Sequence, residues 1–118
     1  MPSRHILIVE DSEFVADALR LLFEADGHRV STAGSVAAGN ALAQTDPVDV
    51  LFLDLTLPDG DGLRVIRDLP PTQRPDTIIV MTGHDDAITQ ARCLAAGCHQ
   101  VLVKPVPIAE LRAVVTSL

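Results

Sequence analysis

The sequence has no tryptophan or tyrosine, and three phenylalanines bring its aromatic content to only 3%. Because 47% of its 118 residues are hydrophobic, the core of this one domain, residues 1–118, must be built from leucine, valine, isoleucine and alanine. No apolar run approaches the roughly 20 residues of a membrane span, and residues 1–12 lack a signal-peptide layout. We therefore expect a cytoplasmic protein without membrane contact.

Basic residues are also scarce. Lysine and arginine total nine against 16 acidic residues, for a net charge of −7, and Lys104 is the only lysine. A surface that binds nucleic acid directly needs a basic stripe, so we expect no direct nucleic-acid contact. The two cysteines, Cys93 and Cys98, show no metal-type pairing and are expected to remain reduced thiols, as in the cytoplasm.

Short apolar runs that end at polar residues recur along the chain. Residues 5–9 and 50–53 lack polar alternation, which is typical of strands buried on both faces of a parallel sheet. Further strands are predicted over residues 29–33, 77–81 and 101–103. Five strands that alternate with helices predict an α/β fold with a five-stranded parallel sheet, and the expected strand order is 2-1-3-4-5.

Helices are predicted between these strands, over residues 12–26, 35–45, 63–69 and 86–96 and from residue 107 onward, from apolar spacing and capping residues. The residues expected on their inner faces are Val15, Leu19, Leu22 and Phe23, then Ala38, Ala41 and Leu42, then Ile88, Ala91 and Leu94, and finally Leu111, Val114 and Val115. The histidines at positions 5, 28 and 99 are interpreted as surface or strand-end residues.

Polar side chains follow four of the predicted strands. Glu10 and Asp11 follow the first strand, Asp54 the third, Thr82 the fourth and Lys104 the fifth. Because parallel strands end at the same edge of a sheet, these five side chains are predicted to share one rim beside the switch point between strands one and three. One acid at a strand end is most often a helix cap or turn residue, but that reading does not explain residues at four strand ends.

The predicted cluster suits phosphoryl chemistry. Three neighbouring carboxylates repel one another unless a cation compensates, and an all-oxygen site favours hydrated Mg²⁺ over Zn²⁺. Lys104 adds a positive charge and Thr82 a hydroxyl group, which together can stabilise a phosphoryl group in transfer. Asp54 is therefore interpreted as the acceptor of that group. The sequence lacks a glycine-rich phosphate loop, so a bound nucleotide is not expected.

The motifs Glu10-Asp11, Asp54 with Leu57-Pro58 and Asp61-Gly62, Thr82-Gly83, Ala96-Gly97 and Lys104-Pro105 stand in order along the chain. In this pattern the chain resembles the receiver domain of two-component response regulators. The resemblance implies a flavodoxin-like (βα)5 sandwich of three layers and a cis bond between Lys104 and Pro105.

The resemblance also implies roles for the site residues. Asp54 would accept a phosphoryl group from a phospho-histidine of a histidine kinase or histidine phosphotransfer protein. Asp11 and the backbone carbonyl of Thr56 would bind Mg²⁺ directly, and Glu10 would bind it mainly through water. Thr82 would act as the switch, and Lys104 would pair with the phosphoryl group. Such a domain catalyses only its own phosphorylation and dephosphorylation, and we do not expect a conventional enzyme.

Two positions depart from the family pattern, and two others bear on phosphoryl lifetime. The family usually has an aromatic switch residue where this chain has Val101, and often Phe after Lys-Pro where this chain has Val106. These changes affect the expected read-out and leave the chemistry intact.

Thr56 and His84 are expected to flank the site and to set the hydrolysis rate, although His84 is equally well explained as a solvated loop residue.

Two other functions are weighed against phosphorylation-dependent signalling. One is a phosphorylation-independent interaction domain, which Val101 favours and the complete set of site residues disfavours. The other is a phosphatase or phosphotransferase for small substrates, for which a second catalytic acid and a substrate-pocket motif are missing.

A homodimer through helix 4, strand 5 and helix 5 fits the resemblance. Both a single-domain regulator and a fragment of a longer one fit the sequence.

Overall fold

A computed structural model describes residues 3–118. Five parallel strands form one sheet in the order β2-β1-β3-β6-β7, which confirms the predicted parallel sheet and its order. Two very short strands, β4 and β5, form a separate antiparallel hairpin after β3. The strands are β1 (His5–Val9), β2 (Arg29–Ala33), β3 (Val50–Asp54), β4 (Thr56–Leu57), β5 (Gly60–Asp61), β6 (Thr77–Thr82) and β7 (Gln100–Val103).

The helices alternate with the strands of the main sheet, as predicted. They are α1 (Glu13–Ala25), α2 (Val36–Thr45), α3 (Arg64–Arg67), α4 (Ala87–Ala95) and α5 (Ile108–Thr116), with a short 3₁₀ turn at Pro71–Gln73. The side chains of Ser12, Ser35 and Asp86 accept backbone N–H groups in the first turns of α1, α2 and α4, which is the ordinary reason for helices to begin there. No helix within residues 3–118 is long and apolar enough to cross a membrane.

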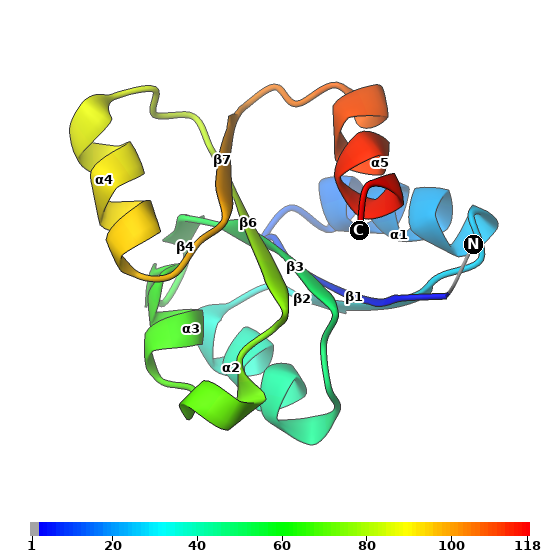
Figure 1. The fold of residues 1–118 in the computed structure, drawn as a ribbon, viewed down its shortest axis with the longest axis horizontal. Coiled ribbons are helices and arrows are strands. Elements are labelled where there is room, and N and C mark those ends of the chain that lie inside the picture. The colour runs from blue at the N-terminus through cyan, green and yellow to red at the C-terminus, as the bar shows by residue number, and fades with distance from the viewer. Residues whose placement is uncertain (1–2) are drawn as a thin grey trace.

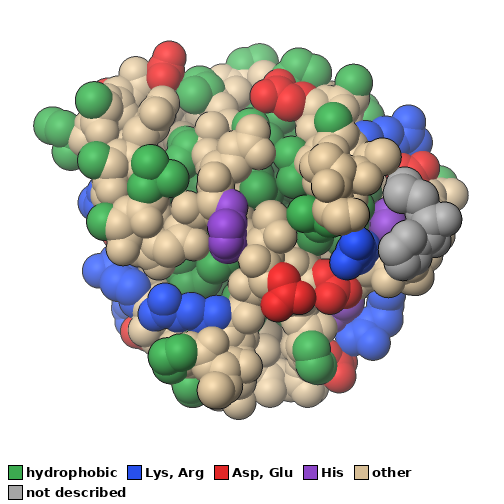
Figure 2. Space-filling view, viewed as in Figure 1, with side chains coloured by type: hydrophobic (Ala, Val, Ile, Leu, Met, Phe, Trp, Pro, Cys, Tyr) green, Lys and Arg blue, Asp and Glu red, His purple; other side chains and the backbone are tan. Residues whose placement is uncertain are grey.

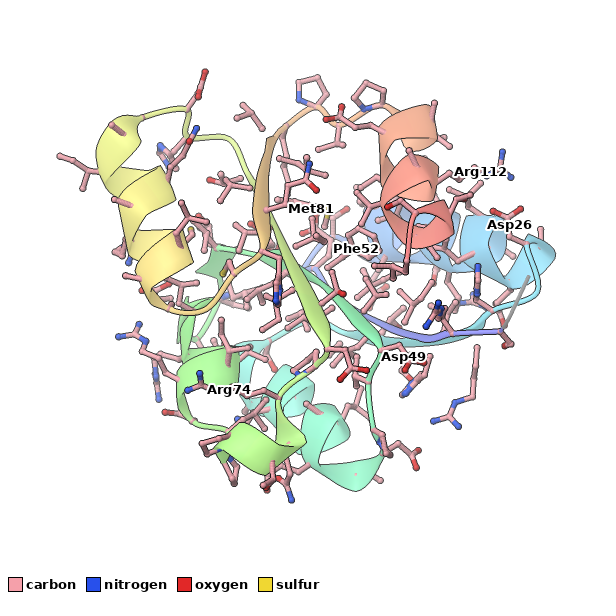
Figure 3. All side chains as sticks on the ribbon, viewed as in Figure 1. Asp26, Asp49, Phe52, Arg74, Met81 and Arg112 are labelled. Atoms are coloured by element: carbon pink, nitrogen blue, oxygen red, sulfur yellow. The ribbon has the colours of Figure 1, made fainter. Side chains whose placement is uncertain are left out.

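The two faces of the sheet carry separate apolar clusters, so the fold has three layers (Figure 1). Successive strand residues point to opposite faces. Ile6 and Ile8 of β1 pack with α1 and α5, whereas Leu7 and Val9 pack with α2, α3 and α4. Phe52, labelled near the sheet centre in Figure 3, stacks on Phe23 of α1 with ring centroids 5.4 Å apart. Because residues on both faces of these strands are buried, the strands contain continuous apolar runs.

The predicted inner faces are largely confirmed for α1 and α5, confirmed in α2 at Leu42 alone, and wrong for α4. In α1 and α5, Leu19, Phe23, Leu111 and Val115 are buried and Leu22 and Val114 are partly buried, whereas Val15 is exposed. In α2 the buried residues are Val36, Gly39 and Ala43. Leu42 is partly buried against the core, whereas Ala38 and Ala41 face solvent. In α4 only Cys93 is buried, while Ile88 is 80% and Leu94 57% exposed.

Gly39 explains why the buried face of α2 differs from the predicted one. A Cβ atom at this position would lie 2.9 Å from the Val9 side chain, so the missing side chain lets α2 approach β1 closely. A hydrophobicity pattern gives glycine little weight, although here glycine occupies the contact face. The same limitation applies to α4, in which the small Cys93 side chain makes the inward contact.

Two histidines predicted to be surface or strand-end residues are buried. The ring nitrogens of His5 lie 2.7 Å from the Pro47 carbonyl oxygen and 2.9 Å from Ser31 Oγ. His28 Nδ1 accepts the Arg4 amide at 3.0 Å. Both rings therefore satisfy polar groups near the amino-terminal edge of the sheet, opposite the rim that carries the acidic cluster, where sequence periodicity gives no sign of their partners.

Candidate functional site

Four strands of the main sheet end at the same rim, and each delivers a polar side chain to it. Asp54 and Thr82 are the last residues of β3 and β6. Glu10 directly follows β1, and Lys104 directly follows β7. The Lys104 amide also donates to the Thr82 carbonyl at 2.7 Å, which fixes these two positions relative to each other. The structure therefore brings the predicted site residues together.

Lys104 links two of the carboxylates. Its Nζ atom donates to Glu10 Oε1 at 2.9 Å and to Asp54 Oδ2 at 3.0 Å. The side chains of Glu10 and Asp54 are only 3% and 10% exposed, and that of Lys104 is 34% exposed. In this partly buried setting the ammonium group provides positive charge that the two carboxylates need.

The third acid completes a compact group of oxygen ligands. One carboxylate oxygen from each of Glu10, Asp11 and Asp54 lies within 4.8 Å of the other two. Asp11 is exposed, whereas Glu10 and Asp54 are buried. Carboxylate oxygens at such spacing match the preference of Mg²⁺ for a few hard anionic ligands and retained waters, so the donor set fits this metal.

The electrostatic balance of the site is visible at its two most strongly coupled groups. Burial raises the pKa of Glu10, and the adjacent Asp54 raises it further, whereas Lys104 acts in the opposite direction. Burial alone would lower the pKa of Lys104, but its hydrogen bonds to Glu10 and Asp54 outweigh this effect and raise it. Lys104 therefore stays charged. The unfavourable effect of the crowded, buried acids appears instead as the raised pKa of Glu10.

The β4–β5 hairpin packs directly against Asp54. The Thr56 amide donates to Asp54 Oδ1 at 3.1 Å, and the Gly62 amide donates to the Leu55 carbonyl at 2.8 Å. A Cβ atom at Gly62 would lie only 2.0 Å from the Asp54 backbone oxygen. The hairpin can therefore close over the end of β3 only because residue 62 is glycine.

The remaining predicted residues occupy distinct places around the rim. Thr82 is buried, and its Oγ1 accepts the His84 amide at 3.1 Å, which places His84 on the loop beside the site. His84 itself is exposed. Val101 stands opposite Val80 in the β6–β7 pairing and packs against the core cluster under α4. The bond between Lys104 and Pro105 is cis, as the resemblance implies.

Asp59, in the turn between β4 and β5, is a further residue near the site that was not predicted from the sequence. Its carboxylate accepts the amides of Val36 and Ala37 at 2.7 and 3.0 Å, at the start of α2. These hydrogen bonds lower the pKa of Asp59. The contact spans 22 and 23 residues of sequence, and no local pattern reports a cap supplied from so far away.

Comparisons with known proteins agree with this geometry. The family model described as "Response regulator receiver domain" matches residues 6–116. The chain is 38% identical over 109 residues to the KDP operon transcriptional regulatory protein KdpE of Escherichia coli K12, which covers 92% of this chain and 48% of that protein. The chain thus spans about half the length of this curated relative.

Two solved structures extend the comparison. The receiver domain of the sensor histidine kinase PA1611 from Pseudomonas aeruginosa PAO1, with a magnesium ion coordinated in its active-site cleft, is 25% identical with a TM-score of 0.85, and the match covers 98% of this chain and 97% of that one. A response regulator from Burkholderia pseudomallei with a phosphorylated aspartic acid is 27% identical with a TM-score of 0.85, over 94% and 65% of the two chains. The chain belongs to the response regulator receiver domain family, the signalling domain of two-component systems.

Proposed function

We propose that Asp54 accepts a phosphoryl group from a phospho-histidine of a histidine kinase or histidine phosphotransfer protein, in a reaction that requires Mg²⁺. The observation that carries this proposal is the position of Lys104 Nζ, 2.9 Å from Glu10 and 3.0 Å from Asp54, beside the third carboxylate of Asp11. Lys104, together with Mg²⁺ held by these acids, would balance the charge of a transferred phosphoryl group.

In this proposal, Asp11, Asp54 and the backbone carbonyl of Thr56 bind Mg²⁺ directly, and Glu10 binds it mainly through water. The clustered carboxylate oxygens support this assignment, as does the magnesium ion held by the related Pseudomonas domain. When bound, Mg²⁺ neutralises the acidic cluster and meets phosphoryl oxygens. The protein's part is to hold these ligands at the carboxyl ends of β1 and β3 and to keep Lys104 beside Asp54.

The transfer forms one bond and breaks another. A carboxylate oxygen of Asp54 attacks phosphorus, the bond from phosphorus to the donor imidazole nitrogen breaks, and the electron pair leaves with the imidazole. Lys104 already contacts Asp54 and can follow the charge onto the phosphoryl oxygens. The hydroxyl of Thr82 lies at the end of the adjacent strand and can donate to the same oxygens as the switch residue.

The read-out surface in this proposal is formed by α4, β7 and α5. Hydrophobic side chains gather over α4 at the upper left of Figure 2, and Ile88 and Leu94 of this helix and Ile108 of α5 are exposed. Such side chains suit a partner protein or a second copy of the chain as a homodimer. Because Val101 has no ring that can rotate between two positions, it cannot serve as an aromatic switch, and the change at Thr82 must reach this surface by other contacts.

We assign control of the phosphoryl group's lifetime to Thr56 and His84. These residues lie two positions after Asp54 and Thr82, respectively. Their amides bond to the Asp54 and Thr82 side chains, which supports a position at the entrance for water. We expect His84→Ala to change the rate of phosphoryl loss. An unchanged lifetime would assign His84 to the solvated loop alone.

The proposed module acts only on itself, so its activity is signalling and not conventional catalysis. Its free cysteine thiols support a cytoplasmic location. Its proposed partners are proteins, and we expect no direct contact between residues 1–118 and nucleic acid. The activity of any longer protein that contains this domain, including transcriptional regulation of the kind named for KdpE, stays a proposal.

Intact-mass spectrometry tests the function. The protein is incubated with a small phosphodonor such as acetyl phosphate, with Mg²⁺ or with a chelator, as wild type and as Asp54→Asn. We expect one phosphoryl adduct per chain, only with Mg²⁺ and only in the wild type. A folded wild-type protein that stays unmodified would refute the proposal and favour a phosphorylation-independent interaction domain.

A further inference from the structure

The turn between β4 and β5 is fastened to a helix that is distant in sequence. Asp59 accepts backbone amides from the first two residues of α2, Val36 at 2.7 Å and Ala37 at 3.0 Å. Ser35 accepts the amide of Ala38, the third residue, at 3.1 Å. The first three amides of α2 are thus satisfied, one by a local cap and two by the hairpin.

The other side of the same hairpin is fastened to α3 and α4. Asp61 Oδ2 accepts from Arg67 at 3.1 Å and from Arg92 at 2.6 Å, and Asp61 Oδ1 accepts the Leu63 amide at 3.0 Å. The hairpin therefore lies between two anchors, one at Asp59 and one at Asp61. Asp59 follows the short β4 strand that carries Thr56, and Asp61 lies in β5, which pairs with β4.

Thr56 is the residue whose backbone carbonyl is proposed above as a Mg²⁺ ligand. A backbone ligand cannot change its rotamer to reach the metal, so its position depends on how the surrounding chain is held. The Thr56 amide is held by Asp54, and Thr56 pairs with Asp61 across the hairpin. Within residues 3–118, the side-chain anchor of the turn between these two paired segments is Asp59, through its bonds to α2.

From this geometry we propose that Asp59 is a positioning residue for the Mg²⁺ site: its bonds to α2 fix the β4–β5 hairpin and thereby hold the Thr56 carbonyl at the metal. The inference rests on the proposed function, because it requires that Mg²⁺ bind at Asp11, Asp54 and Thr56. Asp59 does not touch the metal, and its effect passes through the backbone. A purely structural role as a cap of α2 predicts a loss of stability without a specific loss of metal affinity.

Calorimetric titration with MgCl₂ alone, in the absence of any phosphodonor, separates these two roles. Asp59→Ala removes both bonds to α2 and is expected to raise the Mg²⁺ dissociation constant by about 3- to 10-fold, somewhat less than the loss of a direct outer-shell partner. Ser35→Ala is the matched control, because it removes a cap from the same end of α2 without touching the hairpin. Its Mg²⁺ affinity is expected to equal that of the wild type.

A second control separates position from charge. Glu13→Gln removes a negative charge from the hollow beside Glu10 and Asp11 and leaves the hairpin bonds in place. If Asp59→Ala weakens Mg²⁺ binding no more than Ser35→Ala or Glu13→Gln does, the positioning role is wrong. If the wild type itself does not bind Mg²⁺ at millimolar concentration, the metal site of the proposed function is wrong, and this result is distinct from the first.

Discussion

The substitution Asp11→Asn is expected to stabilise the metal-free protein. Asp11 is exposed, and one of its oxygens lies within 4.8 Å of oxygens of both Glu10 and Asp54. At that distance and at the dielectric constant of water, each like-charge pair costs about 0.9 kcal/mol. Attraction to the nearby Lys104 and screening by salt offset part of this repulsion, which leaves a net gain of about 1 kcal/mol for removal of the Asp11 charge.

Thermal unfolding followed by far-UV circular dichroism measures the effect, since the chain has no tryptophan or tyrosine for fluorescence. In EDTA, Asp11→Asn should raise the melting temperature by about 3–6 °C. Saturating Mg²⁺ should stabilise the wild type by about 2.7 kcal/mol at 100 times its dissociation constant. The variant should gain much less, so that the order of stability reverses when metal is added.

Asp17→Asn serves as the matched control. Asp17 is also an exposed acid of the α1 region, but its oxygen faces Arg20 at 3.4 Å and is not in the acidic cluster. Its neutralisation should leave the melting temperature nearly unchanged or slightly lower, with no dependence on Mg²⁺. If Asp11→Asn lowers the melting temperature in EDTA, the repulsion argument is refuted, because the favourable contacts of Asp11 would then exceed its like-charge cost.

Three further predictions concern contacts around the site and the helices. Gly62→Ala should lower the free energy of unfolding by about 3 kcal/mol or more, because the added carbon would meet the Asp54 backbone oxygen at 2.0 Å; urea denaturation measures this, and a wild-type midpoint would contradict it. Burial raises the pKa of the Cys98 thiol to about 12, so at pH 8 iodoacetamide should label it only after unfolding in urea, and rapid labelling of the native protein would exclude the buried position. Hydrogen bonds from the amide and hydroxyl of Thr89 lower the pKa of Asp86 in the folded protein, so its stabilising effect is present above its ordinary pKa and is lost as the pH falls through the lowered value. Asp86→Ala should therefore destabilise at pH 7, and the difference from the wild type should shrink as the pH falls below the ordinary pKa of aspartate; a difference that stays constant with pH would contradict this sign.

The sheet and the location of the site could be predicted because both depend on strong, local signals. A strand buried on both faces needs a continuous apolar run, and such a run ends visibly at Glu10, Asp54 and Lys104. Once the strands are parallel, chain direction alone brings their carboxyl ends to one rim. The sequence therefore predicts which residues meet without any knowledge of their distances.

The helix faces and the hairpin could not be predicted in the same way. In α2 and α4 the inward residues include Gly39 and Cys93, whose small side chains fill gaps that depend on residues of other elements. The bonds of Asp59 to α2 likewise depend on a tertiary approach. Patterns based on hydrophobicity report where large apolar side chains go, and they do not report contacts made by small or polar groups across the fold.

In the proposed function, the absence of an aromatic residue at position 101 would limit how a change at Asp54 reaches α4. Two connections in the structure do not involve that position. The Lys104 amide bonds to the Thr82 carbonyl, so the proposed shift of Lys104 toward a phosphoryl group would act on the end of β6, directly before the loop into α4. Asp61 of the hairpin bonds to Arg92 of α4, so a movement of the hairpin acts on the helix itself. Since exposed ion pairs contribute little energy individually, the backbone connection through Thr82 is the stronger constraint on α4.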